Sequence, residues 1–187
     1  MVKKNIKKAL VWYRKAAKAG HYGAMNEAGI LYSEGKDVKK DLEQAYEWVS
    51  QAALHGVPGA VYNLGLFLED GIGCTRNMEK AIGMYELARQ ADSPQAAYRL
   101  AAIYRDGDGV EQSYETCFEY CKQASELGSP EATYDLAVLY MNGEGTEKDL
   151  EKALKAAKLA NDRGIKVSID LIRKIEKMMD DGASTRP

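Results

Sequence analysis

Long apolar runs are missing from this sequence. No segment of the 187 residues approaches the roughly 18 consecutive apolar residues that a transmembrane helix needs, so no membrane span is predicted. The lysine-rich N-terminus lacks the apolar segment and the small-residue cleavage site of a secretory signal peptide. A net charge of -2 gives no overall attraction to nucleic acid or to membranes, and nucleic acid is not an expected partner.

Cysteine and histidine are scarce as well. The three cysteines, Cys74, Cys117 and Cys121, cannot all pair within one chain and do not have the spacing of metal ligands. His21 and His55 each lie near a glycine, without a second histidine at ligand spacing. We therefore predict no metal ion and no other cofactor. Unpaired cysteines and the missing signal peptide favour a cytoplasmic location, but the sequence does not determine the compartment.

The sequence does contain a repeat of 36 residues without insertions or deletions. Its hydrophobic fraction of 45% is sufficient for a core. Small residues recur in four columns: Ala16, Ala52, Ala88, Ala124, Ala160; Ala24, Ala60, Ala96, Ala132; Gly35, Gly71, Gly107, Gly143; and Ala9, Ala45, Ala81, Cys117, Ala153. A fifth column, Gly20, Gly56, Asp92, Gly128 and Gly164, is interrupted once. Cysteines stand in columns of small or apolar residues, so we predict structural roles for them.

Each unit is predicted to form two helices. The first, at 22–34 in the first full unit, has apolar and small residues at helical spacing and ends at the Gly35 column. Proline opens this helix in the later units, and Ser93 and Ser129 can cap it. The second helix, at 42–55, follows a column of good N-cap residues, namely Asn5, Asp41, Asn77, Ser113 and Asp149.

A single hairpin cannot bury its own apolar stripe, so the units are expected to stack into an all-α solenoid of about ten helices. The predicted divisions are a partial repeat with only a second helix (1–20), four full repeats (21–164), a C-terminal capping helix (165–182) and a disordered tail (183–187). In the closing helix, Arg173 and Glu176 replace a small and an aromatic residue, which indicates a surface that faces water.

The chain opens in the middle of a unit, since Val2 is in register with Val38 and Val110. This favours an excised piece of a longer array over a natural start. In that case the first helix, which carries Trp12 and Tyr13, exposes apolar surface through which the chain is expected to self-associate.

Several segments resemble the Sel-one-like repeat (SLR) family. They are VKKNIKKALVWYRKAAKAG (2–20), the pattern of Ala60, Tyr62, Leu64 and Gly65, and the G-x-G segments that begin at Gly71 and Gly143. The resemblance covers about residues 2–164 and implies a right-handed α-α superhelix related to tetratricopeptide repeats. It also implies a protein-interaction scaffold or adaptor, since members of this family serve many tasks on one fold.

In solenoids of the tetratricopeptide type the first helix of each hairpin lines a concave groove. By this resemblance we expect the partner-binding residues on the concave face to be Asn26, Tyr62, Tyr98, Tyr134, Asn63, Arg99, Glu69, Arg105, Leu66 and Val138. The tyrosine column has two interpretations, which the sequence leaves open. Tyrosine supplies stiff, amphipathic contact area at binding hot spots, and it also packs neighbouring units together.

The charges of the groove columns bear on the ligand. Arg99 and Arg105 are outnumbered by acids, which argues against a clamp for a C-terminal carboxylate and favours a peptide or helix with apolar anchors and some positive charge. The seven cations and no acids of residues 1–26 indicate a solvated helix face or, alternatively, a patch for an acidic partner.

The leading hypothesis is therefore a scaffold that binds another protein, as a peptide or a helix, on its concave face. The alternative is an assembly module that stacks on itself or on further repeats of a longer protein. An enzyme is the least supported hypothesis, because no nucleophile–base pair, carboxylate pair or metal set stands outside the repeat columns, and we predict no catalytic residue. The G-x-G pairs follow helices rather than strands, so we expect turns and not a phosphate cradle.

Overall fold

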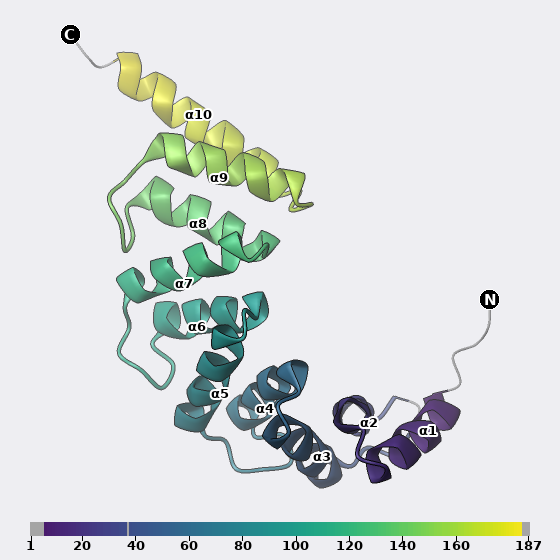
Figure 1. The fold of residues 1–187 in the computed structure, drawn as a ribbon. Helices are drawn as coiled ribbons and strands as arrows, with labels where there is room; N and C mark the ends of the chain where they lie inside the picture. The colour runs from purple at the N-terminus through teal and green to yellow at the C-terminus, as the bar shows by residue number, and fades with distance from the viewer. Residues whose placement is uncertain (1–5, 37, 185–187) are drawn as a thin grey trace. The chain divides into compact units, whose positions relative to one another are not determined.

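The computed structural model describes residues 6–36 and 38–184, and these contain ten α-helices and no strand (Figure 1). The all-α class and the helical hairpins are thus confirmed. The helices are α1 (Ile6–Lys18), α2 (Tyr22–Glu34), α3 (Leu42–Leu54), α4 (Pro58–Asp70), α5 (Met78–Gln90), α6 (Pro94–Asp106), α7 (Tyr114–Glu126), α8 (Pro130–Asn142), α9 (Leu150–Asp162) and α10 (Ser168–Ser184). Two compact units divide the chain, Met1–Ala91 with α1–α5 and Asp92–Pro187 with α6–α10.

The helix termini are set by the local signals of the sequence. The side chains of Asp41, Asn77, Ser113 and Asp149 each accept a hydrogen bond from the backbone N–H three residues on. Ser93 and Ser129 cap α6 and α8 in the same way, directly before the prolines that begin these helices. Asn5, the fifth predicted cap, lies outside the described residues. The Gly35 column ends α2, α4, α6 and α8 in the left-handed conformation, as predicted.

Asp92, the one interruption of its glycine column, keeps the backbone conformation of that column. Its φ is +57°, whereas the four glycines have φ between +73° and +101°. Aspartate is one of the few residues other than glycine that adopt the left-handed region at modest cost. The turn is therefore repeated even where its usual residue is replaced.

The G-x-G segments form turns between helices, and their second glycine makes a contact that the sequence did not predict. A Cβ atom on Gly73 would lie 1.9 Å from the carbonyl oxygen of Leu42, the first residue of α3. A Cβ atom on Gly145 would lie 2.0 Å from the carbonyl oxygen of Tyr114, the first residue of α7. Each turn thus presses against the start of the second helix of the preceding hairpin, at a distance that only glycine allows.

The predicted small columns form the core of both units. Ala52, Ala88, Ala124 and Ala160 are buried, as are Ala60, Ala96 and Ala132. Cys117 and Cys121 are buried in α7, Cys74 is half-buried, and all three are free thiols. In the N-terminal unit, Val49 and Phe67 pack with the half-buried Tyr32 and Leu64. Within each unit, these close alanine and glycine contacts hold each helix against the next one along the chain.

The closing helix differs in extent from the prediction. It begins at Ser168 instead of 165 and continues through Ser184, so two residues of the predicted tail are helical. Arg173 and Glu176 are exposed, as their charge indicated. Leu171 and Ile175, on the other side of α10, are buried against α8 and α9.

Candidate functional site

Five of the ten predicted partner-binding residues belong to the N-terminal unit. Tyr62, Asn63 and Leu66 are half-buried, but Asn26 is only 7% exposed. The Asn63 amide Nδ2 donates a hydrogen bond of 2.9 Å to Oδ1 of Asn26. Tyr62 packs its ring against Tyr85 of α5, with the centroids 5.7 Å apart. These residues therefore join α2 to α4 and α4 to α5.

Glu69 does not lie where the sequence placed it. Glu69 is only 6% exposed, and its Oε2 accepts a hydrogen bond of 2.6 Å from the hydroxyl of Tyr85. Arg76 Nε also donates to the Glu69 carbonyl oxygen at 3.0 Å. Met141, which occupies the same column two repeats later, is buried as well. Glu69 therefore turns toward the second helix of its hairpin and supports the fold instead of forming binding surface.

The C-terminal unit brings together the other part of the predicted face. The hydroxyl of Tyr98 donates a hydrogen bond of 3.0 Å to Oδ2 of Asp135, 37 residues away. Asn63 and Asn26 are separated by the same 37 residues. In both units, a residue of one first helix thus bonds with the neighbouring column of the next first helix. Tyr98 packs adjacent repeats in this way and is still half-buried, with part of its surface open to solvent.

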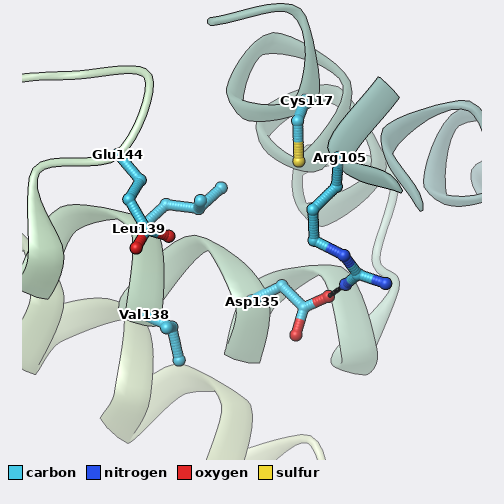
Figure 2. A pocket seen from close by; sticks show the side chains of 6 residues that line it. All are labelled: Arg105, Cys117, Asp135, Val138, Leu139 and Glu144. Atoms are coloured by element: carbon cyan, nitrogen blue, oxygen red, sulfur yellow. Dashed lines mark ion pairs between the residues drawn. The ribbon is translucent and has the colours of Figure 1, made fainter. Parts of the chain in front are cut away.

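A small cavity of about 80 Å³ lies beside Asp135. Its lining residues come from α6, α7, α8 and the turn after α8, and they are Arg105, Cys117, Asp135, Val138, Leu139 and Glu144. Figure 2 shows the guanidinium of Arg105 directed toward the carboxylate of Asp135, and their closest N–O distance is 3.5 Å. We call these six residues together with Tyr98 the Arg105 pocket.

The charge balance at the Arg105 pocket is negative. Arg105 makes hydrogen bonds of 3.0 and 3.4 Å to Asp106, so its charge is engaged by this neighbour and by Asp135. The hydrogen bond with Asp106 holds the pKa of Arg105 above its usual range. Glu144 also lines the cavity, so its lining holds two carboxylates and one cation. This excess of negative charge attracts positive charge.

Asp135 is the titratable group most affected by this environment. Burial raises its pKa above the ordinary 3.8, against the opposing effects of the Tyr98 hydrogen bond and of Arg105. The folded protein therefore binds a proton at Asp135 at a higher pH than the unfolded chain does. Asp135 opposes folding at neutral pH, and this penalty disappears as the pH falls through the raised pKa.

We expect Asp135→Asn to remove this pH dependence. Relative to the wild type, the variant should become less stable as the pH falls from 7 toward about 4, because the wild type alone gains a proton on folding. Urea unfolding of both proteins at several pH values measures this difference. The variant Asp108→Asn, at an exposed position, serves as the control. A difference in stability between wild type and Asp135→Asn that stays constant with pH contradicts the assignment.

The remaining predicted residues lie around the Arg105 pocket or outside it. Val138 lines the pocket, whereas Tyr134 packs against the core formed by α8, α9 and α10. Arg99 is half-buried on α6. Asp106, Cys117, Leu139 and Glu144 were not predicted to belong to the site. The contact between Tyr98 and Asp135 could have been found from the repeat. Their separation of 37 residues is one more than the repeat length, which places them on neighbouring first helices.

Other candidate sites carry less chemistry. His55 stacks on the ring of Tyr22, with the centroids 3.6 Å apart, and His21 is an exposed residue before α2. A wider depression of about 600 Å³ between α9 and α10 contains none of the predicted residues. Within residues 6–36 and 38–184, no three metal-binding side chains lie together. None of the helices in those ranges combines the length and the apolar character needed to cross a bilayer.

Repeated helical hairpins and tight glycine turns define a repeat protein of the α-solenoid class. Comparison with protein families specifies the class further. A family model for the Sel1 repeat matches residues 1–21, 23–57, 58–93, 94–129 and 130–164. The chain belongs to the Sel1 repeat family, which confirms the resemblance inferred from its sequence. Sel1 repeat proteins generally serve as protein-interaction scaffolds, and their fold is of a non-catalytic scaffold type.

Solved structures agree with this assignment. A Sel1 repeat protein from Oxalobacter formigenes is 25% identical, with a TM-score of 0.76 over 88% of this chain and 74% of that one. The protective antigen c5321 of uropathogenic Escherichia coli, which displays an SLR fold, is 29% identical with a TM-score of 0.80. The match covers 85% of this chain but only 34% of the antigen. The immunity protein Pa5087 from Pseudomonas aeruginosa shares the fold at 23% identity, with a TM-score of 0.56 over 85% of this chain and 59% of that one. No functionally curated protein matches the chain.

Proposed function

We propose that this protein is an adaptor that binds a peptide or a helix of another protein on the concave face predicted for its first helices, with the Arg105 pocket as the anchor site. The observation that carries this proposal is the pocket itself. A half-buried tyrosine, the apolar side chains of Val138 and Leu139, and the carboxylates of Asp135 and Glu144 lie together with Arg105 on α6, α8 and the turn that follows α8.

The chemistry of the Arg105 pocket favours a particular kind of ligand side chain. Its small volume accepts a short apolar group or the stem of a longer residue against Val138 and Leu139. A terminal ammonium or guanidinium group would then meet the carboxylates of Asp135 and Glu144, which Arg105 does not fully neutralise. A lysine or arginine next to an apolar or aromatic residue is the ligand motif that these groups recognise. Exposed parts of Tyr98 supply rigid contact area for that neighbour.

Selection of phage-displayed dodecapeptides on the full chain tests the proposal. We expect selected peptides to contain a basic residue beside an apolar one, and Tyr98→Ala to weaken binding of a selected peptide about tenfold, or ~1.4 kcal/mol. Asp135→Asn should weaken the binding of peptides that carry the basic residue. It should weaken the binding of peptides in which alanine replaces that basic residue less. Isothermal titration calorimetry provides the dissociation constants.

A matched control is available in the same unit. Tyr114 is 39% exposed at the start of α7 and does not line the pocket. Tyr114→Ala should change the affinity less than twofold, and circular dichroism should show that Tyr98→Ala keeps its helices. If both alanine variants bind the selected peptides as tightly as the wild type, the Arg105 pocket is not the binding site.

A second candidate function is assembly. Trp12 on α1 is 68% exposed, Val11 is 52% exposed, and both belong to the basic first helix. An uncovered tryptophan of this kind favours docking of another chain, either a second copy or further repeats. The two functions are compatible, because α1 and the Arg105 pocket belong to different units.

A further inference from the structure

Helix α1 is in register with the second helices of the four hairpins, but its equivalent side chains are uncovered. Its Ala16 and Tyr13 are partly exposed and Trp12 is 68% exposed. The residues equivalent to Ala16 and Tyr13 in the other four second helices are at most 2% exposed. They are Ala52, Ala88, Ala124 and Ala160 for Ala16, and Val49, Tyr85, Cys121 and Ala157 for Tyr13. An adjoining side of α1 is covered normally, since Leu10 and Ala17 are buried.

In each hairpin of the chain a first helix covers this face. Helices α2, α4, α6 and α8 pack on α3, α5, α7 and α9 respectively. Trp48, the counterpart of Trp12, packs edge-on against Tyr32 of α2, with the ring centroids 5.9 Å apart. Tyr85, the counterpart of Tyr13, lies so close to Gly65 of α4 that a Cβ atom there would be 2.5 Å from its Cε1. The four hairpins therefore show which type of helix covers the face that is exposed on α1.

Helix α10 of a second copy is not a helix of this kind. Helix α10 is a first helix, but Arg173 stands at the position of Gly65, with its side chain 75% exposed. Glu176 stands at the position of Tyr32 and pairs with Lys158 at 3.8 Å. Where a tyrosine faces the crossing point, as Tyr85 does, even a Cβ atom would overlap the ring, so an arginine does not fit there. Stacking of α10 on the α1 helix of another copy is thus excluded by shape.

Pairing of two α1 helices is opposed by charge. Residues 1–26 contain seven cations and no acid, and Arg14, Lys15 and Lys18 are exposed on α1. Two such helices side by side would bring like charges together. First helices of the type found in α4 are acidic, because α4 carries Glu69 and Asp70 and no basic residue. The charge of α1 therefore favours a helix of that kind over a second copy of itself.

We propose that α1 docks, in trans, an acidic amphipathic first helix of another repeat protein, with glycine at the crossing point over Tyr13 and an apolar residue three positions later against Trp12. The proposal rests on the second candidate function, assembly through α1, and specifies its partner. Glycine is required because Tyr13 occupies the column of Tyr85, and an aromatic ring at this position leaves no room for a Cβ atom.

A peptide with the sequence of residues 57–71, stapled as a helix on its solvent side, is the probe. It contains α4 with Gly65 and two acidic residues. The protein is the full chain with Trp48→Phe, so that Trp12 is the only tryptophan. We expect a saturable blue shift of the Trp12 fluorescence, because docking removes the indole from water. Helix staples avoid most of the ordering cost that an isolated peptide of this length would have.

Two control peptides and two protein variants test the specificity. The same peptide with Gly65→Arg should bind at least tenfold more weakly, and a stapled peptide of residues 167–181, from α10, should give no shift. Tyr13→Lys in the protein should also weaken docking at least tenfold while Trp12 still reports. Tyr98→Ala should leave the shift unchanged, which separates this site from the Arg105 pocket.

Three outcomes would overturn the proposal. One is a Trp12 spectrum that does not respond to the α4 peptide while circular dichroism shows the helices intact. Another is equal binding of the glycine and arginine peptides, because shape at the crossing point would then play no part. The third is a dimer of the chain in sedimentation velocity that Trp12→Ala dissociates and the α4 peptide does not, which would make a second copy the occupant.

Discussion

Replacement of Gly145 by alanine should lower the free energy of unfolding by about 3 kcal/mol. Gly145 has a φ of +69°, which disfavours a residue with a Cβ atom by roughly 1–2 kcal/mol. The larger effect is steric. The new methyl group would lie 2.0 Å from the carbonyl oxygen of Tyr114, 2.4 Å from its carbon and 2.8 Å from the backbone nitrogen of Glu115. All three atoms belong to the backbone at the start of α7 and cannot move aside as a side-chain tip would.

A second glycine separates the two causes. Gly128 has a φ of +98°, and nothing lies within 4 Å of the position that its Cβ atom would occupy. Gly128→Ala should therefore show the backbone cost alone, roughly 1–2 kcal/mol. Chemical denaturation followed by circular dichroism at 222 nm measures both variants. Similar losses for Gly128→Ala and Gly145→Ala would mean that the turn after α8 does not press on α7 in solution.

This contact illustrates which parts of the fold the sequence predicts. Helix ends depend on a few neighbouring residues, so the caps at Asp41 and Ser93 and the glycine that ends α2 were all predictable from local chemistry. The reason for the second glycine in each G-x-G pair was not, because its partner carbonyl lies about 31 residues earlier in the chain. A repeat alignment shows that a residue recurs but not which backbone it touches.

The Arg105 pocket was predicted only in part for a related reason. Columns indicate a face as an average over the repeats. Arg105 and Val138 do line one cavity, and Tyr98 bonds to Asp135, which lines it as well. The orientation of each side chain in a column depends on the residues around it. Arg105 is held at the surface by Asp106, whereas Glu69 in the same column turns inward to Tyr85. Hydrogen bonds between side chains on different helices decide such cases, and no periodicity encodes them.

The buried pair of Glu69 and Tyr85 leads to the second large effect. Tyr85→Phe should lower the free energy of unfolding by about 2 kcal/mol. The ring of Tyr85 is fully buried between Tyr62 and Gly65, and phenylalanine fills the same space, so the variant creates almost no cavity. What it removes is the hydroxyl that donates to Glu69 at 2.6 Å. A carboxyl oxygen that loses a donor inside the protein regains little from water.

A double-mutant cycle isolates this hydrogen bond. Glu69→Gln keeps an acceptor for Tyr85 and should cost less than Tyr85→Phe, whereas the two changes together should cost at least 1 kcal/mol less than their sum. Tyr114→Phe, at an exposed tyrosine, should be neutral within about 0.5 kcal/mol.

Urea titrations of the wild type, the two single variants and the double variant give the coupling energy. Strict additivity would contradict a hydrogen bond that depends on the charge of Glu69, and replacement of Glu69 by glutamine should then alter peptide affinity. With the coupling in place, Glu69→Gln should change stability and leave the affinity of peptides for the Arg105 pocket unchanged, because a side chain committed to Tyr85 has no surface left to offer.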